Sequence, residues 1–253
     1  MTERLTSMKN PKVQFFRSLK ERKGRLAGGA FLAEGEKMAA EALASGFPVE
    51  ALLLREDHAP PPGLPADLPV FVLPEHVFAS LSDTRTPQGI AAVVRMQPRP
   101  PVGSRLIALD GVQDPGNVGT ILRTADAAGL DGVLLGPDCA DVFSPKTLRA
   151  TMGSIFRMGL LFPEDLASRL SALRAEGFAI LSSQLDGELF SALPAPGDRW
   201  VLVIGSEGNG VSAAVRAAAT HHIRLPMRGG AESLNAAVAA GIMMYELMKN
   251  IPE

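Results

Sequence analysis

The second part of the chain alternates short apolar runs with longer segments in which apolar residues recur every three or four positions. The apolar runs lie at 105–112, 132–136, 178–184, 200–208 and 222–227, and helical spacing is found at 117–129, 144–153, 164–177, 212–219 and after 233. The runs are continuous rather than alternating, which is typical of strands buried on both faces of a parallel sheet. The pattern therefore predicts an α/β domain with a mostly parallel sheet covered by helices on both faces.

The first part of the chain predicts a smaller α/β domain. A helix is expected at 35–46, strands at 49–55, 69–74 and 89–96, and a short helix between the last two strands. A proline-rich stretch follows, in which Pro98, Pro100 and Pro101 favour a stiff, extended connector. We therefore predict a small first domain over 1–97, a linker over 98–104 and a second domain over 105–253.

Composition narrows the class of protein. The chain has 253 residues, of which 46% are hydrophobic, and no apolar run approaches the roughly 20 residues that span a bilayer. The first residues contain no apolar segment of the kind found in secretory signals, so a cytoplasmic protein without a membrane partner is expected. Cys139 is the only cysteine, and His221 and His222 would point to opposite faces of a strand. We therefore expect no metal site.

Charge is unevenly distributed, although the formal net charge is only −2. The first 25 residues carry a dense group of cations, opposed only by Glu3 and Glu21. Such a patch can bind the phosphates of a nucleic acid. Val13, Phe16 and Leu19 recur at helical spacing, so the charges can equally belong to the solvated face of an amphipathic helix. The candidate nucleic-acid-binding residues are Lys9, Lys12, Arg17, Lys20, Arg22, Lys23 and Arg25.

Three glycine-containing loops follow apolar strands, at the edge where parallel sheets bind ligands. In the first loop, Asp114, Pro115 and Gly116 predict a turn, and Asn117 is expected to cap the following helix. Arg123 would then lie on the second turn of that helix, from which it can reach a ligand. The alternative is an ordinary exposed arginine on the helix surface, or an ion pair between Arg123 and Asp126, three positions further on.

The second loop has glycines at 205, 208 and 210. Their spacing is the reverse of the dinucleotide-binding fingerprint, which argues against a nicotinamide or flavin site. Glycines here still permit a ligand to approach the backbone, or a tight turn between strand and helix. Glu207 would be costly if buried alone, so we expect it to be paired with an arginine or with backbone N–H groups.

The third loop leads into the apolar helix near the end of the sequence. Pro226 ends the preceding strand, and Ser233 is expected to cap the helix. Asn235, in the first turn, is less well explained by capping. Together with the free N–H groups at the positive end of a helix, it suits the binding of a polar or anionic group.

These segments resemble a known family. In order and spacing, 117–129, 203–212 and 223–241 resemble the three motifs of the SpoU (TrmH-like) RNA ribose 2′-O-methyltransferases of the SPOUT superfamily. The segments 7–43 and 81–94 look like the substrate-binding N-terminal domain of rRNA-directed members, which is ribosomal L30e-like, and 143–158 is similar to the segment that those members carry after the first motif. The resemblance thus covers nearly the whole chain.

The resemblance implies a C-terminal domain with a deep trefoil knot, S-adenosylmethionine as cofactor and a homodimer. It places the cofactor at Gly205, Leu225, Met227, Ser233 and Leu234. It implies catalytic roles for Arg123, Asn117, Glu207 and Asn235. The expected substrate is structured RNA, with 23S-type rRNA first and tRNA second, and the nucleotide is not identified. The chain departs from the family pattern at two places. Ala128 stands where many relatives have an aromatic residue, and Ala236 and Ala237 stand where relatives often have a second serine.

The implied reaction is attack of a ribose 2′-hydroxyl on the sulfonium methyl of the cofactor. Family precedent makes Arg123 the base, but a guanidinium with a pKa above about 12 is almost fully protonated at neutral pH. Our interpretation is that Arg123 holds the 2′-oxygen or a neighbouring phosphate and stabilises the developing negative charge. The alternatives are a non-catalytic RNA-binding protein that keeps the fold and, less well supported, an NAD-linked oxidoreductase.

Overall fold

The computed structural model describes residues 2–97, 99–192 and 197–249. Pro98, which belongs to the expected linker, lies outside these residues. The chain divides into two compact units. Unit 1 comprises residues 1–97 together with 141–156, and unit 2 comprises 98–140 together with 157–253. The segment 141–156, which the sequence boundary placed in the second domain, therefore packs within unit 1.

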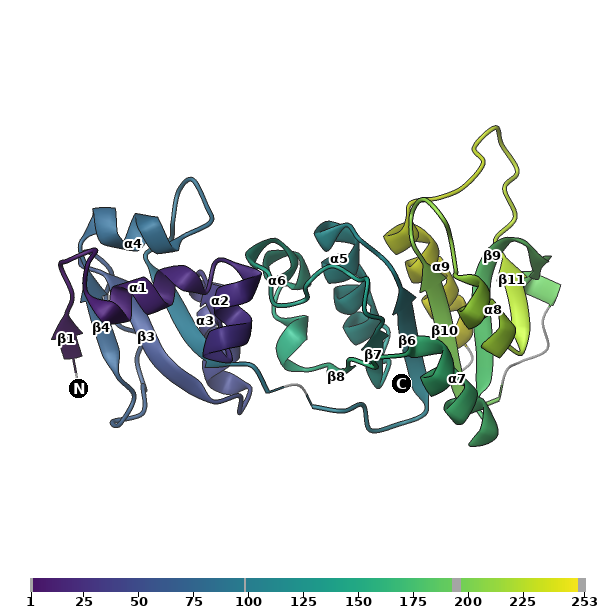
Figure 1. Ribbon diagram of the computed structural model, residues 1–253, viewed down its shortest axis with the longest axis horizontal. Coiled ribbons are helices and arrows are strands. Elements are labelled where there is room, and N and C mark those ends of the chain that lie inside the picture. Colours follow the sequence, from purple (N-terminus) through teal and green to yellow (C-terminus); the bar gives the residue numbers. More distant parts are fainter. Residues whose placement is uncertain (1, 98, 193–196, 250–253) are drawn as a thin grey trace. The chain divides into compact units, whose positions relative to one another are not determined.

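Unit 1 is built on a five-stranded sheet with the order β1-β4-β3-β5-β2 (Figure 1). Strands β1, β4 and β3 are parallel, and β5 runs antiparallel to both β3 and β2. Its elements are β1 (Thr2–Arg4), α1 (Pro11–Ser18), α2 (Arg22–Gly28), β2 (Ala30–Glu34), α3 (Glu36–Ala44), β3 (Val49–Arg55), β4 (Val70–Leu73), α4 (Glu75–Leu81), β5 (Ile90–Arg95), α6 (Pro145–Thr151) and the 3-10 helix η1 (Ser154–Phe156). The predicted helix and strands between residues 35 and 96 are confirmed, whereas β1, α2 and β2 were not foreseen.

The core of unit 1 includes residues from the distant segment 141–156. On one face of the sheet, α1 and α4 supply Phe16 and Phe78 to a cluster of buried apolar side chains. Elsewhere, the ring of Phe31 on β2 lies 5.0 Å from Phe143 and 6.2 Å from Phe156, both of which are almost fully buried. Because these aromatic rings bury large apolar areas, the late segment is part of the core that stabilises unit 1.

Unit 2 contains a six-stranded sheet in which every pair of neighbouring strands is parallel, with the order β11-β9-β10-β6-β7-β8. This confirms the predicted parallel sheet. Its elements are β6 (Arg105–Asp110), α5 (Pro115–Ala127), β7 (Gly132–Leu135), β8 (Gly159–Leu161), α7 (Leu166–Ala175), β9 (Ala179–Leu189), η2 (Phe190–Ala192), β10 (Trp200–Gly205), α8 (Ala213–Ala218), β11 (His221–Arg224) and α9 (Ala236–Met248).

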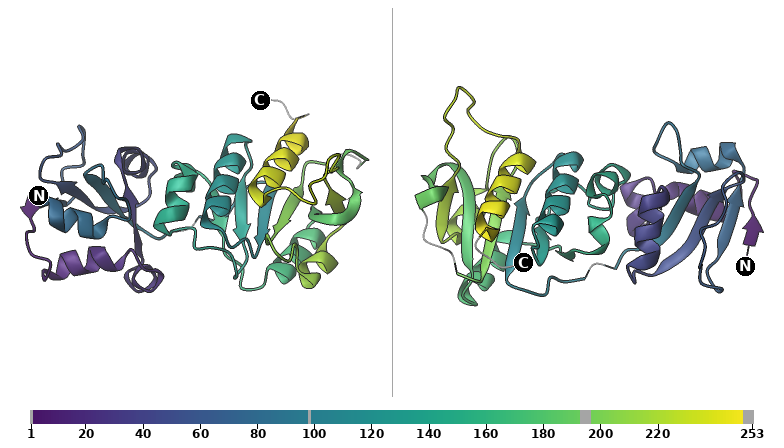
Figure 2. Two further views of the ribbon diagram at one scale, coloured as in Figure 1. Left: turned by 90° about the horizontal axis from the view of Figure 1, so that it is seen from above. Right: turned by 180° about the vertical axis from the view of Figure 1, so that it is seen from behind.

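Helices cover both faces of this sheet, as the continuous apolar runs predicted. Figure 2 shows α5 and α9 on one side of the sheet and α7 and α8 on the other. Leu170 and Leu173 of α7 and Val215 of α8 pack on Leu106, Ala108 and their neighbours. The next residues along β6, Ile107 and Leu109, are also fully buried, as expected for a strand with helices on both faces. This arrangement leaves the loops at the carboxyl ends of the strands free to form a site.

Within the described residues, no helix is both long and apolar enough to cross a membrane.

Candidate functional site

A cavity of about 990 Å³ lies at the carboxyl ends of β9, β10 and β11 in unit 2. Two of the three loops singled out in the sequence line it, namely 204–211 and the segment that joins β11 to α9. The lining residues include Gly205, Leu225, Met227, Ser233 and Leu234, all of which were predicted to contact a cofactor, as well as Glu207 and Asn235. Asn117 and Arg123 are not among the lining residues.

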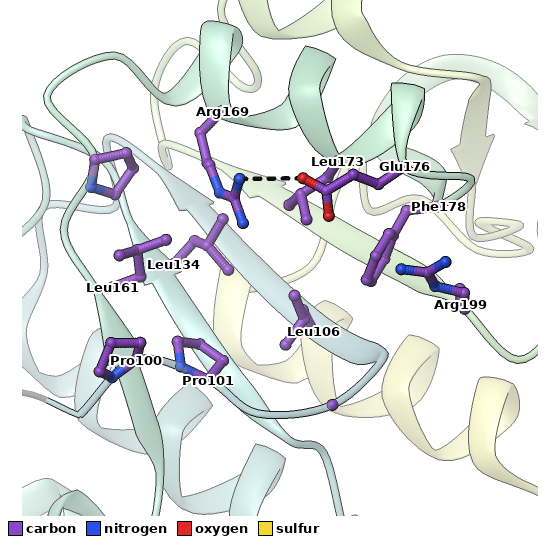
Figure 3. A pocket seen from close by; sticks show the side chains of 12 residues that line it. Pro100, Pro101, Leu106, Leu134, Leu161, Arg169, Leu173, Glu176, Phe178 and Arg199 are labelled. Carbon is purple, nitrogen blue, oxygen red and sulfur yellow. Dashed lines mark hydrogen bonds and ion pairs between the residues drawn. The ribbon is translucent and has the colours of Figure 1, made fainter.

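A second cavity, of about 440 Å³, has none of the predicted site residues in its wall (Figure 3). Its apolar lining includes Leu106 and Leu173, and the guanidinium of Arg199 lies 4.5 Å from the centre of the Phe178 ring. Arg169 and Glu176, which both lie on the α7 side of this cavity, form a long ion pair of 3.5 Å. Because the chemistry-bearing loops gather elsewhere, the larger cavity is the candidate site.

The glycines of the second loop have structural roles that the sequence left open. A Cβ atom on Gly205 would lie only 2.1 Å from the carbonyl carbon of Gly210 and 2.2 Å from the nitrogen of Val211. Gly210 has a φ of +66°, and Ser206 and Gly210 exchange two backbone hydrogen bonds of 3.0 Å. Gly205 and Gly210 are therefore required by a tight turn, whereas Gly208 has open space around it.

Glu207 joins the second loop to the first. Its carboxylate accepts a hydrogen bond of 2.8 Å from the Asn117 side-chain amide, and longer ones of 3.2 and 3.4 Å from the backbone N–H groups of Gln113 and Asp114. The backbone N–H partners expected for Glu207 are thus confirmed. Its side-chain partner is the amide of Asn117 rather than an arginine. Burial raises the pKa of Glu207, but the hydrogen bonds from Asn117 and from backbone N–H groups outweigh it, so the pKa lies below its ordinary value.

Asn235 joins the third loop to the same network. Its Nδ2 donates a hydrogen bond of 2.9 Å to Asn117 Oδ1, while its Oδ1 accepts hydrogen bonds from the backbone N–H groups of Ala237 (2.9 Å) and Val238 (3.3 Å). Asn235 is therefore the N-cap of α9, and the prediction that Ser233 caps this helix was wrong. Ser233 lies before the helix, exposed at the wall of the cavity.

The prediction that Asn117 caps the first-motif helix was also wrong. The cap of α5 is Asp114, whose Oδ1 accepts a hydrogen bond of 2.9 Å from the backbone N–H of Asn117, and Pro115 occupies the first helical position. Because Asp114 performs the capping, the Asn117 side chain is free to hold Glu207 and Asn235 at once. One amide thus connects all three loops.

Arg123 lies on the third turn of α5, not the second, and its side chain is exposed. The alternative of an ion pair with Asp126 was wrong, because Asp126 accepts hydrogen bonds of 2.9 and 2.7 Å from Arg157. Among the described residues, no hydrogen bond or ion pair involves the Arg123 guanidinium. It is therefore available to bind an anionic oxygen from outside the chain.

The candidate RNA-binding cations in unit 1 divide into two groups. Arg25 was wrongly placed among them, because it is only 3% exposed, and its guanidinium binds Asp141 (2.5 Å) and the carbonyl of Leu19 (2.9 Å). Lys12 pairs with Glu3 at 2.5 Å, and Lys20 donates to the carbonyl of Ser82 at 2.8 Å. The remaining cations are exposed and have no partner among the described residues. We call these the four unpaired cations: Lys9, Arg17, Arg22 and Lys23.

Some residues that line the cavity were not identified from the sequence. Residues 183–186 of β9 also line it, as do Arg216 and Arg224, and only the position of β9 in the sheet shows this. In the described part of the chain, no group of three histidine, cysteine or acidic side chains is placed to hold a metal ion.

The comparisons with known proteins agree with this geometry. The model of the SpoU rRNA Methylase family matches residues 104–245, and that of the MRM3-like substrate binding domain matches residues 10–92. The chain is 38% identical over 247 residues to the 23S rRNA (guanosine(2553)-2′-O)-methyltransferase RlmP of Bacillus subtilis, which covers 97% of this chain and 99% of the relative.

Solved structures show the same fold over the whole chain. A putative RNA methyltransferase of the TrmH family from Porphyromonas gingivalis matches with a TM-score of 0.87 and 39% identity, covering 95% of this chain and 98% of the other. An AdoMet-bound rRNA methyltransferase from Sinorhizobium meliloti matches with a TM-score of 0.89 and 30% identity, covering 100% and 99%. The knot stays a prediction of the family fold. With its three motif loops joined through Asn117, the chain belongs to the SpoU rRNA methylase family.

Proposed function

We propose that the protein transfers a methyl group from S-adenosylmethionine to a ribose 2′-hydroxyl of 23S-type rRNA in the cytoplasm. The observation that carries this proposal is the hydrogen-bonded connection Glu207–Asn117–Asn235, which joins the three family motifs beside a cavity large enough for the cofactor. The relatives named above, an rRNA 2′-O-methyltransferase and an AdoMet-bound rRNA methyltransferase, support the same activity.

In this proposal the cofactor occupies the larger cavity, against Gly205, Leu225, Met227, Ser233 and Leu234. Two features of the cavity suit it: a tight turn at Gly205, whose backbone forms part of the wall, and a mixed wall of apolar and polar side chains. The cofactor supplies the activated methyl group. Asn117, Glu207 and Asn235 are positioning residues, because their hydrogen bonds are made with one another and with the backbone.

Arg123 is the proposed catalytic residue. Its guanidinium has no carboxylate partner among the described residues, so it can bind the ribose 2′-oxygen or an adjacent phosphate and stabilise the charge that develops during transfer. This role does not require the guanidinium to lose its proton. Measuring the methyl-transfer rates of Arg123→Lys and wild type across pH tests this role. If the rate of the lysine variant recovers strongly at high pH, residue 123 acts as a base rather than by holding the oxygen in place.

We propose that the active form is a homodimer. Val238, Ile242 and Tyr245 form a stripe along one side of α9, and their side chains are 51%, 47% and 55% exposed. An apolar stripe at helical spacing requires cover. Light scattering tests this: wild type is expected as a dimer at micromolar concentration and Ile242→Glu as a monomer. A monomeric wild type would contradict the proposal.

The four unpaired cations of unit 1 are the proposed contacts to rRNA phosphates. In this proposal unit 1, which comprises 1–97 together with 141–156, binds the substrate, and unit 2 carries out the transfer. The decisive experiment is transfer of labelled methyl from S-adenosylmethionine to total RNA from a strain that lacks this protein. The product is mapped by sequencing that detects 2′-O-methylation. One ribose mark in 23S rRNA that disappears with Arg123→Ala supports the proposal, whereas a mark confined to tRNA would favour the tRNA alternative.

A further inference from the structure

Strand β9 carries extra residues at the wall of the cofactor cavity. It pairs with β11 in two stretches: His221 and His222 lie opposite Leu181 and Ser182, while Ile223 and Arg224 lie opposite Glu188 and Leu189. Five residues of β9, 183–187, thus correspond to no residue of β11. We call this segment the β9 bulge. Four of its residues, 183–186, line the cavity.

The β9 bulge returns to the sheet through a close approach of two backbones. A Cβ atom on Gly187 would lie 2.7 Å from the carbonyl of His222 and from the nitrogen of Ile223, so only glycine fits here. At this point the carbonyl of Gly187 accepts a hydrogen bond of 2.9 Å from Nε of Arg224. The bulge therefore fixes the orientation of the Arg224 guanidinium at the end of β11.

Most of the charged groups at the cavity wall are already paired. Arg216 binds Asp186 at 3.1 Å, and Glu207 is held by Asn117 and backbone N–H groups. Arg224 differs, because within the described chain it contacts no carboxylate and only its Nε has a hydrogen-bond partner. Its two terminal nitrogens keep the planar geometry that binds a carboxylate with two parallel hydrogen bonds.

We propose that Arg224 binds the α-carboxylate of S-adenosylmethionine, an inference that rests on the proposed function. The amino-acid part of the cofactor carries one carboxylate and one ammonium group. The cavity offers one unpaired cation, Arg224, and one acidic side chain without a partner among the described residues, Glu232. This pair matches the zwitterion in sign, and Arg224 acts as a specificity residue that distinguishes the cofactor from nucleosides without a carboxylate.

The test compares two ligands by isothermal titration with the full chain. S-adenosylhomocysteine carries the carboxylate, and S-adenosyl-3-thiopropylamine is the same molecule without it. Arg224→Met should weaken binding of the first ligand by about tenfold or more, the value of a charge-assisted hydrogen bond, and leave the second unchanged. The affinity of Arg224→Lys for S-adenosylhomocysteine should lie between those of wild type and Arg224→Met, because lysine keeps the charge but cannot form two parallel hydrogen bonds to a carboxylate. Arg216→Met is the matched control and should keep the wild-type preference for the carboxylate, since Asp186 already occupies Arg216.

Unchanged binding of the decarboxylated ligand shows that the Arg224 variants keep an intact cavity. The proposal is overturned if Arg224→Met keeps the wild-type ratio of the two affinities, or if both ligands weaken equally. A wild-type protein that binds neither ligand would overturn the proposed cofactor itself, which separates failure of the function from failure of this inference.

Discussion

The side chain of Asn235 makes two kinds of hydrogen bond, and isosteric substitution separates them. Oδ1 caps α9, whereas Nδ2 holds Asn117. Asn235→Ala removes both. Asn235→Asp keeps the capping oxygen, since aspartate is as good an N-cap as asparagine, but it replaces the donor to Asn117 with a second acceptor.

The structure sets the expected magnitudes. Loss of an N-cap costs about 1 kcal/mol, and loss of an ordinary hydrogen bond costs about 1 kcal/mol more. Asn235→Ala should therefore lower the free energy of unfolding by about 2 kcal/mol and Asn235→Asp by about 1 kcal/mol. Methyl transfer should fall in both variants by about fivefold, because about 1 kcal/mol of positioning energy lost with the bond to Asn117 corresponds to that factor.

Urea unfolding can be followed by the fluorescence of Trp200, the only tryptophan, which is buried in β10 of the same unit. Asn10 provides a matched control, because it caps α1 in unit 1 with a hydrogen bond of 2.8 Å from the backbone N–H of Lys12. Asn10→Asp, whose unfolding is followed by circular dichroism because Asn10 lies in unit 1, should leave stability unchanged. Equal destabilisation of the two Asn235 variants would refute the capping role, and full activity of Asn235→Asp would refute the role of the bond to Asn117.

Three further predictions follow from contacts in both units. Asp141→Asn should lower the free energy of unfolding by about 3 kcal/mol in a urea assay followed by circular dichroism, because Arg25 stays buried without its counter-ion. As a control, Asp57→Asn should have little effect in the same assay, because the ion pair of Asp57 with Arg55 (2.5 Å) is exposed on the Asp57 side. The folded pKa of Glu207 is depressed, so its stabilising effect is present above the unfolded pKa of about 4.3 and is lost as pH falls through the folded pKa. The stability advantage of wild type over Glu207→Gln should therefore be constant above about pH 5 and shrink at lower pH, and an advantage that grew on acidification would contradict this. Replacement of the four unpaired cations with glutamine should reduce the slope of log affinity for rRNA against log salt concentration by about 3. Lys12→Gln is the control, because Lys12 is already paired with Glu3. An unchanged slope in the fourfold variant would show that RNA binds elsewhere.

Hydrophobic periodicity correctly predicted the parallel sheet, its covering helices and the loops that form the site. The N-cap residues of the helices were harder to predict, because aspartate, serine and asparagine are all good N-caps and more than one of them occurs in each loop. In the first loop, the pair Asp114 and Pro115 did carry a usable signal, since proline favours the first helical position and the residue before it then becomes the cap. In the third loop, nothing in the local sequence distinguishes Ser233 from Asn235.

Long-range partners were beyond the reach of the sequence. Arg25 reads as one more surface cation, and only the fold shows that Asp141, more than a hundred positions away, makes it a core residue. The apolar pattern of 141–156 predicts α6 but not which core it joins. The five-residue excess of β9 over β11 is likewise invisible until the two strands are paired.

The assignment of residues 141–156 to unit 1 sets an order for synthesis on the ribosome. After residue 97 emerges, about sixty more residues, including β6, α5 and β7, must be made before Phe143, Phe156 and Asp141 can complete that unit. At about 5–20 residues per second, the delay is several seconds, during which Phe31 and Arg25 lack their final neighbours. The nascent chain is therefore expected to need chaperone protection at this stage, and a fragment ending at residue 97 should not fold. Exchange of substrate-binding units between relatives must carry both segments together.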